Sequence, residues 1–198
     1  MKLRSSFCIL LFEDIKLKKD FYLRLLPRAT DLVVFECGRS IPISTANVPN
    51  ALIIKCASHG DLLKNLHDIL EDRSLLINDH FMNTLVIENL SSFYWTLRCK
   101  KVADRIQWYE QLHRVLLTIR DEYKCNILVT AWDNNYERGF NVKERWSGQP
   151  QKLDDLTYMP LTLYQRVEHV FAFQKGRSFM FKENRWVLLL NGEESHGI

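Results

Sequence analysis

The chain has 198 residues, a length typical of one domain and too short to add a second catalytic domain. Of these residues 46% are hydrophobic and 26% are charged, which is the composition of an ordinary globular protein. The formal net charge of +3 is too small to indicate nucleic-acid binding by itself. We therefore expect a single domain that spans residues 1–198.

Apolar runs of strand length alternate with segments of helical period, the pattern of an α/β protein with a largely parallel sheet flanked by helices. Strands are predicted at 7–12, 32–37, 51–56, 84–87 and 126–130. Helices are predicted at 15–26, after a capping box formed by Ser58 and Asp61, and over 102–119.

The last part of the chain has a different pattern. Residues 133–158 have no periodicity and are predicted to form a long functional or mobile loop. Short β-rich runs within 170–190 then predict a C-terminal antiparallel meander. The phenylalanines of this meander alternate, which favours core packing over a ligand site. They are Phe171, Phe173, Phe179 and Phe181.

The five cysteines are widely spaced and form no Cys-x-x-Cys pair, which argues against a disulfide framework or a zinc site. The apolar run Phe7–Phe12 is shorter than a signal-peptide core and too short to span a bilayer. We expect a soluble intracellular protein with reduced thiols and no membrane association.

The segment from Thr84 to Trp95 reads Thr-Leu-Val-Ile-Glu-Asn-Leu-Ser-Ser-Phe-Tyr-Trp, a strand that ends in an acid and leads into a polar and aromatic turn. It resembles the Walker B region of the RecA-like recombinase paralogues, in particular the paralogues of Shu complexes. Residues 157–160 and 188–194 also resemble that subgroup. The resemblance implies a RecA-like core over nearly the whole chain from Phe7.

The nucleotide site that this resemblance implies is degenerate. Only 7 glycines are present and none precedes Gly38, whereas a phosphate loop needs glycines so that backbone N–H groups can surround the phosphates. Placing the family's frame on residues 13–20 puts Lys19 at the lysine position and Asp20 at the hydroxyl position. Glu13 and Lys18 then replace the glycines, and we expect no ATP binding.

The other positions of that site point the same way. Cys37 stands where the resemblance implies a catalytic glutamate, and Trp132 stands where it implies a nucleotide-sensing glutamine. Glu88 matches the Walker B acid in kind, and two roles stay open for it: capping the following loop or binding magnesium. We expect a pseudo-ATPase with no bound cofactor and no catalytic residues.

Cations and aromatic rings are mixed in the long loop, and a dense basic run follows the Walker B strand; the resemblance makes both segments DNA-facing loops. The predicted contacts are Arg138, Lys143, Arg145, Trp146 and Lys152 in the long loop, and Arg98, Lys100 and Lys101 after the Walker B strand. A solvated loop or a partner-binding lid is the alternative for the first group, and a solvated helix start is the alternative for the second. A third group, Lys16, Lys18 and Lys19, has interleaved aspartates and is expected to be solvated.

The resemblance implies a nuclear, non-catalytic recombinase paralogue that acts in homologous recombination and DNA repair. Its implied partners are other recombinase paralogues, a SWIM-domain protein, the recombinase filament, and single-stranded or forked DNA. Two alternatives stay open: a P-loop ATPase subunit whose site a partner completes in trans, and a purely structural adaptor without DNA contact.

Overall fold

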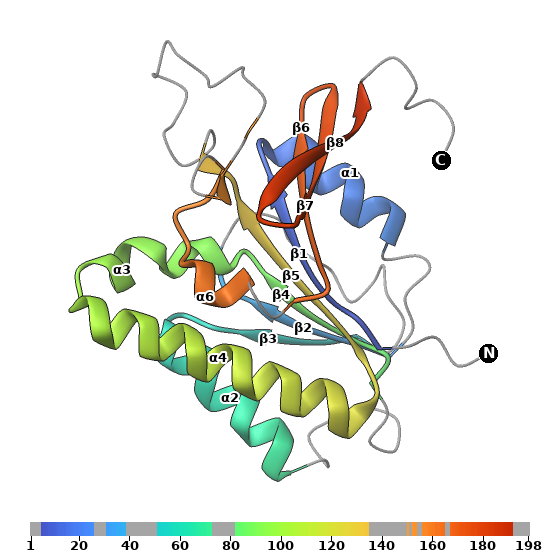
Figure 1. Cartoon of the computed structure of the whole chain (residues 1–198). Helices are drawn as coiled ribbons and strands as arrows, with labels where there is room; N and C mark the ends of the chain where they lie inside the picture. Colours follow the sequence, from blue (N-terminus) through green and yellow to red (C-terminus); the bar gives the residue numbers. More distant parts are fainter. Residues whose placement is uncertain are drawn as a thin grey trace.

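The computed structural model describes residues 5–25, 31–38, 51–72, 82–134, 150, 152–153, 156–164 and 167–191. Among these residues, eight strands form one sheet in the order β3-β2-β4-β5-β1-β6-β7-β8 (Figure 1). The strands are β1 (Phe7–Phe12), β2 (Leu32–Glu36), β3 (Ala51–Lys55), β4 (Thr84–Glu88), β5 (Asn126–Trp132), β6 (His169–Gln174), β7 (Arg177–Lys182) and β8 (Arg185–Asn191). The strands from β3 to β6 in this order run parallel, whereas β7 and β8 are antiparallel. The predicted α/β architecture with a C-terminal meander is confirmed.

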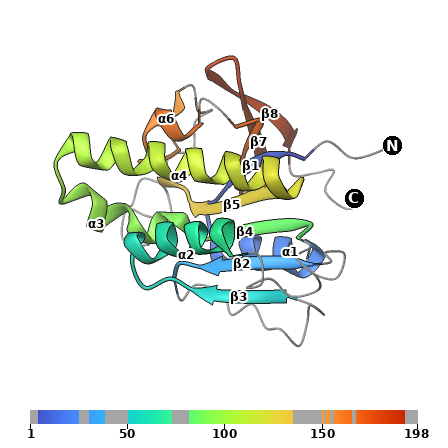
Figure 2. The same ribbon diagram turned by 90° about the horizontal axis from the view of Figure 1, so that it is seen from below.

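Helices cover both faces of the sheet, which explains why the central strands are apolar on both sides. The helices are α1 (Ile15–Leu25), α2 (His59–Glu71), η4 (Leu90–Phe93, a 3₁₀ helix), α3 (Tyr94–Arg98), α4 (Val102–Tyr123) and α6 (Leu161–Tyr164). The larger core cluster contains residues of α2, α3, α4 and α6, and Figure 2 shows α2 and α4 running side by side. Helix α1 packs in two smaller clusters on the other face. In the described part of the chain, no helix is long and apolar enough to cross a membrane.

The start of α2 has the predicted capping box. The Ser58 side chain accepts a hydrogen bond from the Asp61 backbone N–H at 3.1 Å, and the Asp61 carboxylate accepts one from the Ser58 N–H at 2.9 Å. Trp108 of α4 donates its indole N–H to the carbonyl of His59 at 3.1 Å. This bond fixes the first turn of α2 against α4.

The meander extends the parallel sheet rather than forming a separate unit, because β6 pairs with β1 in parallel register. The prediction that its phenylalanines are packing residues is confirmed. Phe173 stacks on Phe12 with ring centroids 5.3 Å apart, and Phe171 lies in the same cluster. Phe179 is buried in the larger core cluster on the opposite face, and Phe181 packs against that cluster.

Candidate functional site

The connection between β1 and α1 consists of only two residues, Glu13 and Asp14. A phosphate loop of the Gly-x-x-x-x-Gly-Lys type is longer and surrounds the phosphates with backbone N–H groups. Here Ile15 already begins the helix, so most of the frame placed on residues 13–20 is helical. The Asp14 carboxylate accepts a hydrogen bond from the Leu17 N–H at 2.8 Å and so occupies the end of the helix that attracts anions.

An ion pair joins α1, the helix that follows this connection, to the end of β4. The Lys18 ammonium is 2.7 Å from the Glu88 carboxylate, and both side chains have 0% exposure. The expectation that Lys18 is solvated is therefore wrong, because Lys18 lies one helical turn before Tyr22 on the face that packs against the sheet. Lys19 and Asp20, the residues that the family frame assigned to the nucleotide, are both exposed.

Each charge of this pair stabilises the other at a buried position that solvent does not reach. Burial lowers the pKa of the Lys18 ammonium below its ordinary value, and the neighbouring Glu88 carboxylate offsets part of that decrease. The sequence left two roles open for Glu88, capping the following loop and binding magnesium, and neither of them involves a lysine. In this structure the partner of the Glu88 carboxylate is the Lys18 ammonium.

Aromatic and hydroxyl side chains enclose the ion pair. The Trp132 ring lies with its centroid 4.2 Å from the Lys18 ammonium nitrogen, a cation–π distance. The Tyr22 hydroxyl is 3.1 Å from the Thr130 hydroxyl, which also accepts a hydrogen bond from the Asn89 N–H at 3.0 Å. Burial raises the pKa of Tyr22 well above its ordinary value. The tryptophan that replaces the expected glutamine thus covers the pair.

The end of β2 approaches this cluster closely. The Cys37 backbone N–H donates to the Glu88 carbonyl at 3.0 Å. A Cβ at Gly38 would lie 2.8 Å from the side-chain Nδ2 of Asn89, so a larger residue there would push the Asn89 side chain aside. Hydrogen bonding to Cys56 and burial raise the pKa of the Cys37 thiol well above its ordinary value. The raised pKa disfavours the thiolate, which is the reactive form of a cysteine.

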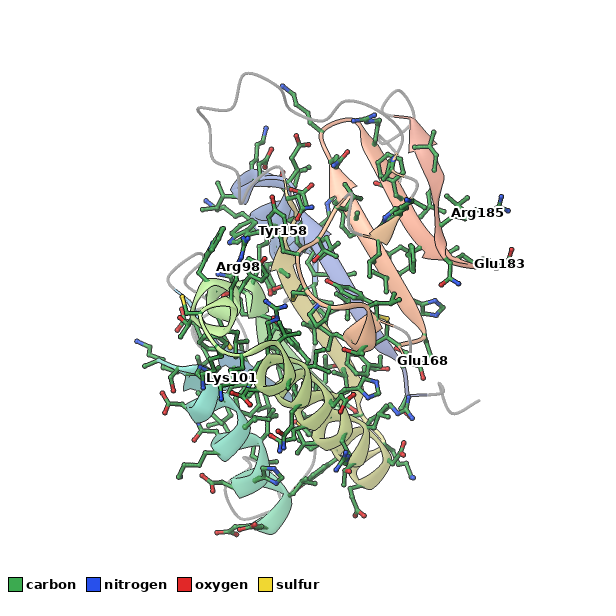
Figure 3. The ribbon with its side chains drawn as sticks, turned by 60° about the vertical axis from the view of Figure 1, so that its left-hand side comes forward. Arg98, Lys101, Tyr158, Glu168, Glu183 and Arg185 are labelled. Atoms are coloured by element: carbon green, nitrogen blue, oxygen red, sulfur yellow. The ribbon has the colours of Figure 1, made fainter. Side chains whose placement is uncertain are left out.

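The structure describes four of the eight residues that are predicted to contact nucleic acid. Arg98, Lys100 and Lys101 are all exposed where α3 ends and α4 begins, and Figure 3 labels Arg98 and Lys101 there. Lys152 is also exposed, and its carbonyl accepts a hydrogen bond from the Trp186 indole of β8 at 3.0 Å. The other residues predicted for the long loop lie outside the described residues. They are Arg138, Lys143, Arg145 and Trp146.

Two aromatic residues that the sequence analysis did not assign to a site lie beside Arg98. Trp95 is half exposed, and its ring centroid is 6.5 Å from that of Tyr158, which comes from the segment that follows the long loop. The Phe-Tyr-Trp run that carried the family resemblance was the available signal for Trp95. Nothing in the sequence alone indicates that Tyr158 returns to it.

A family model described as Shu complex component Psy3, DNA-binding, matches residues 55–176, which is more than half of the chain. The comparison with curated proteins found no match. The matched region contains β4 with Glu88, α3 with its exposed cations, and β5 with Trp132. This agrees with the predicted resemblance to recombinase paralogues of the Shu type. The chain belongs to the Shu complex component Psy3 family, and its role lies in homologous recombination and DNA repair.

Proposed function

We propose that this protein is a non-catalytic, DNA-binding subunit of a Shu-type complex that acts in the nucleus. The observation that carries the non-catalytic part is the buried Lys18–Glu88 pair. In a P-loop enzyme the lysine of the first helix binds phosphate oxygens, and the Walker B acid acts on magnesium. Here Glu88, at the Walker B position, is already paired with Lys18, which the family frame places at a glycine position, and Trp132 covers the pair.

The exposed cations after β4 support direct contact with single-stranded DNA. Arg98, Lys100 and Lys101 are the three charged residues between Tyr94 and Ala103, and no carboxylate lies among them. Side chains of this kind release counterions from the phosphate backbone when they bind it, which gives an affinity that depends on salt. The DNA-binding description of the family agrees with this role.

The proposed partners are other recombinase paralogues and a SWIM-domain protein, and the proposed result is recombinase filament assembly on single-stranded or forked DNA. Support for these partners comes from the resemblance of the segment 84–95 and from the family description. Identification of the proteins that co-purify with the chain tests this directly. Recovery of the chain alone, with neither kind of partner, would contradict it.

The DNA-binding part is tested by the triple variant Arg98→Glu, Lys100→Glu and Lys101→Glu, titrated with an oligo-dT strand over a salt series. We expect weaker binding and a salt slope that falls by about 0.7 for each phosphate that the variant no longer neutralises. The matched control is Lys182→Glu with Arg185→Glu, which reverses exposed cations on the meander. Equal affinity and slope for the triple variant and the wild type would leave the structural-adaptor alternative.

A further inference from the structure

We infer that Trp95, together with Tyr158 and Arg98, forms a platform on which one base of a single-stranded nucleic acid stacks. This inference rests on the proposed DNA-binding function and names the part of the surface that reads the base rather than the phosphate. Arg98 was already a predicted DNA contact, whereas Trp95 and Tyr158 are identified neither by that prediction nor by the family description.

The Trp95 ring is supported by a buried ring and is itself half exposed. Its side chain is 50% exposed, although a ring of this size is usually buried in a protein interior. Tyr94, which is only 6% exposed, contacts it edge-on with ring centroids 5.1 Å apart. An exposed ring with a buried support has little conformational freedom to lose when a base stacks on it.

Tyr158 approaches the same support from a distant part of the chain. Its ring stacks on Tyr94 with centroids 5.3 Å apart and an interplanar angle of 24°. Two hydrogen bonds hold the residues just before Tyr158 in place. The Thr157 hydroxyl is 2.8 Å from the buried Tyr164 hydroxyl. The Leu156 carbonyl accepts a hydrogen bond from the Asn134 N–H at 3.0 Å. Trp95 lies close to both Tyr158 and Arg98, which Figure 3 labels. The residues after β4 and those after the long loop therefore form one surface.

Charge next to the rings favours a nucleic acid over a protein as the ligand. The Arg98 guanidinium carbon lies over the Trp95 ring, 5.4 Å from its centroid, so a cation lies directly next to the exposed ring. The exposed residues from Thr96 to Lys101 are mostly polar or cationic, whereas the core of a protein interface is depleted of charge. Rings that stack bases and cations that follow the phosphates are the combination typical of single-strand binding.

The test uses the full-length chain in the complex in which it is isolated, with fluorescent oligo-dT and a matched abasic strand as probes. Trp95→Ala should weaken oligo-dT binding about 5- to 100-fold, because stacking on one ring contributes roughly that much per base. Abasic-strand binding should stay unchanged, and Trp95→Phe should retain most of the oligo-dT affinity. The matched control is Leu189→Ala, which removes another partly exposed apolar side chain, on β8.

Each outcome separates the platform from the proposed function. Unchanged oligo-dT binding by Trp95→Ala, or equal weakening on both strands, would overturn the platform while DNA binding stands. If Trp95→Ala lost a protein that co-purifies with the wild type but kept its DNA affinity, the platform would also be overturned, because Trp95 would then contact that protein. If the wild-type complex bound neither strand, the proposed function itself would fail.

Discussion

The ammonium nitrogen of Lys18 lies 2.7 Å from Oε1 of Glu88, and neither side chain has any exposed surface. This pair joins the helix after β1 to the end of β4, the two elements that hold phosphate and metal in a P-loop enzyme. A nucleotide that bridges these elements in an enzyme contributes stability there. In this chain two side chains of the protein itself form the bridge.

The first prediction concerns the removal of one partner from this pair. Lys18→Met should lower the free energy of unfolding by about 3–5 kcal/mol, because it leaves the Glu88 carboxylate buried without its ammonium. Urea denaturation followed by circular dichroism measures the change. The matched control is Lys19→Met, since Lys19 is exposed on the same helix and its replacement should change stability by about 0.5 kcal/mol or less.

A double variant tests whether the two charges depend on each other. Lys18→Met combined with Glu88→Leu removes both charges and fills the space with apolar side chains, so it should be more stable than Lys18→Met alone. Such coupling is the signature of a direct pair. If the two destabilising effects simply add, Lys18 and Glu88 contribute independently and the bridge described above is wrong.

The second prediction concerns nucleotides. Calorimetric titration of the purified complex with ATP and magnesium should give no binding heat that belongs to this subunit, because Lys18 and Glu88 are already paired. The melting temperature of the chain should likewise not rise with ATP, since only a ligand of the folded state shifts it. Magnesium-dependent heat that disappears in Lys19→Ala or Glu88→Ala would instead support an ATPase site completed in trans.

Most of the fold could be predicted because each central strand is a short apolar run and each long helix has a clear apolar stripe. Helix α3, at five residues, is too short to show a period, so the sequence could not place Trp95 or Arg98 on it. It was harder to predict which residues of α1 face the sheet. The family frame assumed a loop before the lysine, whereas the helix already begins at Ile15.

A shift of one residue on a helix turns a side chain by about 100°. That angle separates the exposed Lys19 from the buried Lys18, so the residue that pairs with Glu88 is the neighbour of the one that the family frame puts at the lysine position. The sequence places Glu88 at the end of its strand, because the apolar run before it fixes that end. Its partner could not be predicted, since α1 and β4 lie far apart in the sequence and a pairing between them leaves no local pattern.

The third prediction concerns the capping box of α2. Ser58→Ala removes the acceptor for the Asp61 N–H and should lower the free energy of unfolding by about 1 kcal/mol. Thermal denaturation measures it, and Thr96→Ala, which changes an exposed residue of α3, is the control. A Ser58→Ala protein as stable as the control would show that the Asp61 carboxylate and the Trp108 hydrogen bond suffice to fix the start of α2.

The fourth prediction compares two tryptophans that lie next to cations. Trp132 is 5% exposed over Lys18, so Trp132→Ala leaves a cavity beside a buried charge and should cost about 3–5 kcal/mol. Trp95 is half exposed beside Arg98, so Trp95→Ala should change stability far less while it weakens oligo-dT binding. Urea denaturation and DNA titration of both variants measure the contrast. Equal destabilisation by the two substitutions would mean that Trp95 is a packing residue, because a ring whose removal unfolds the protein is not available to a base.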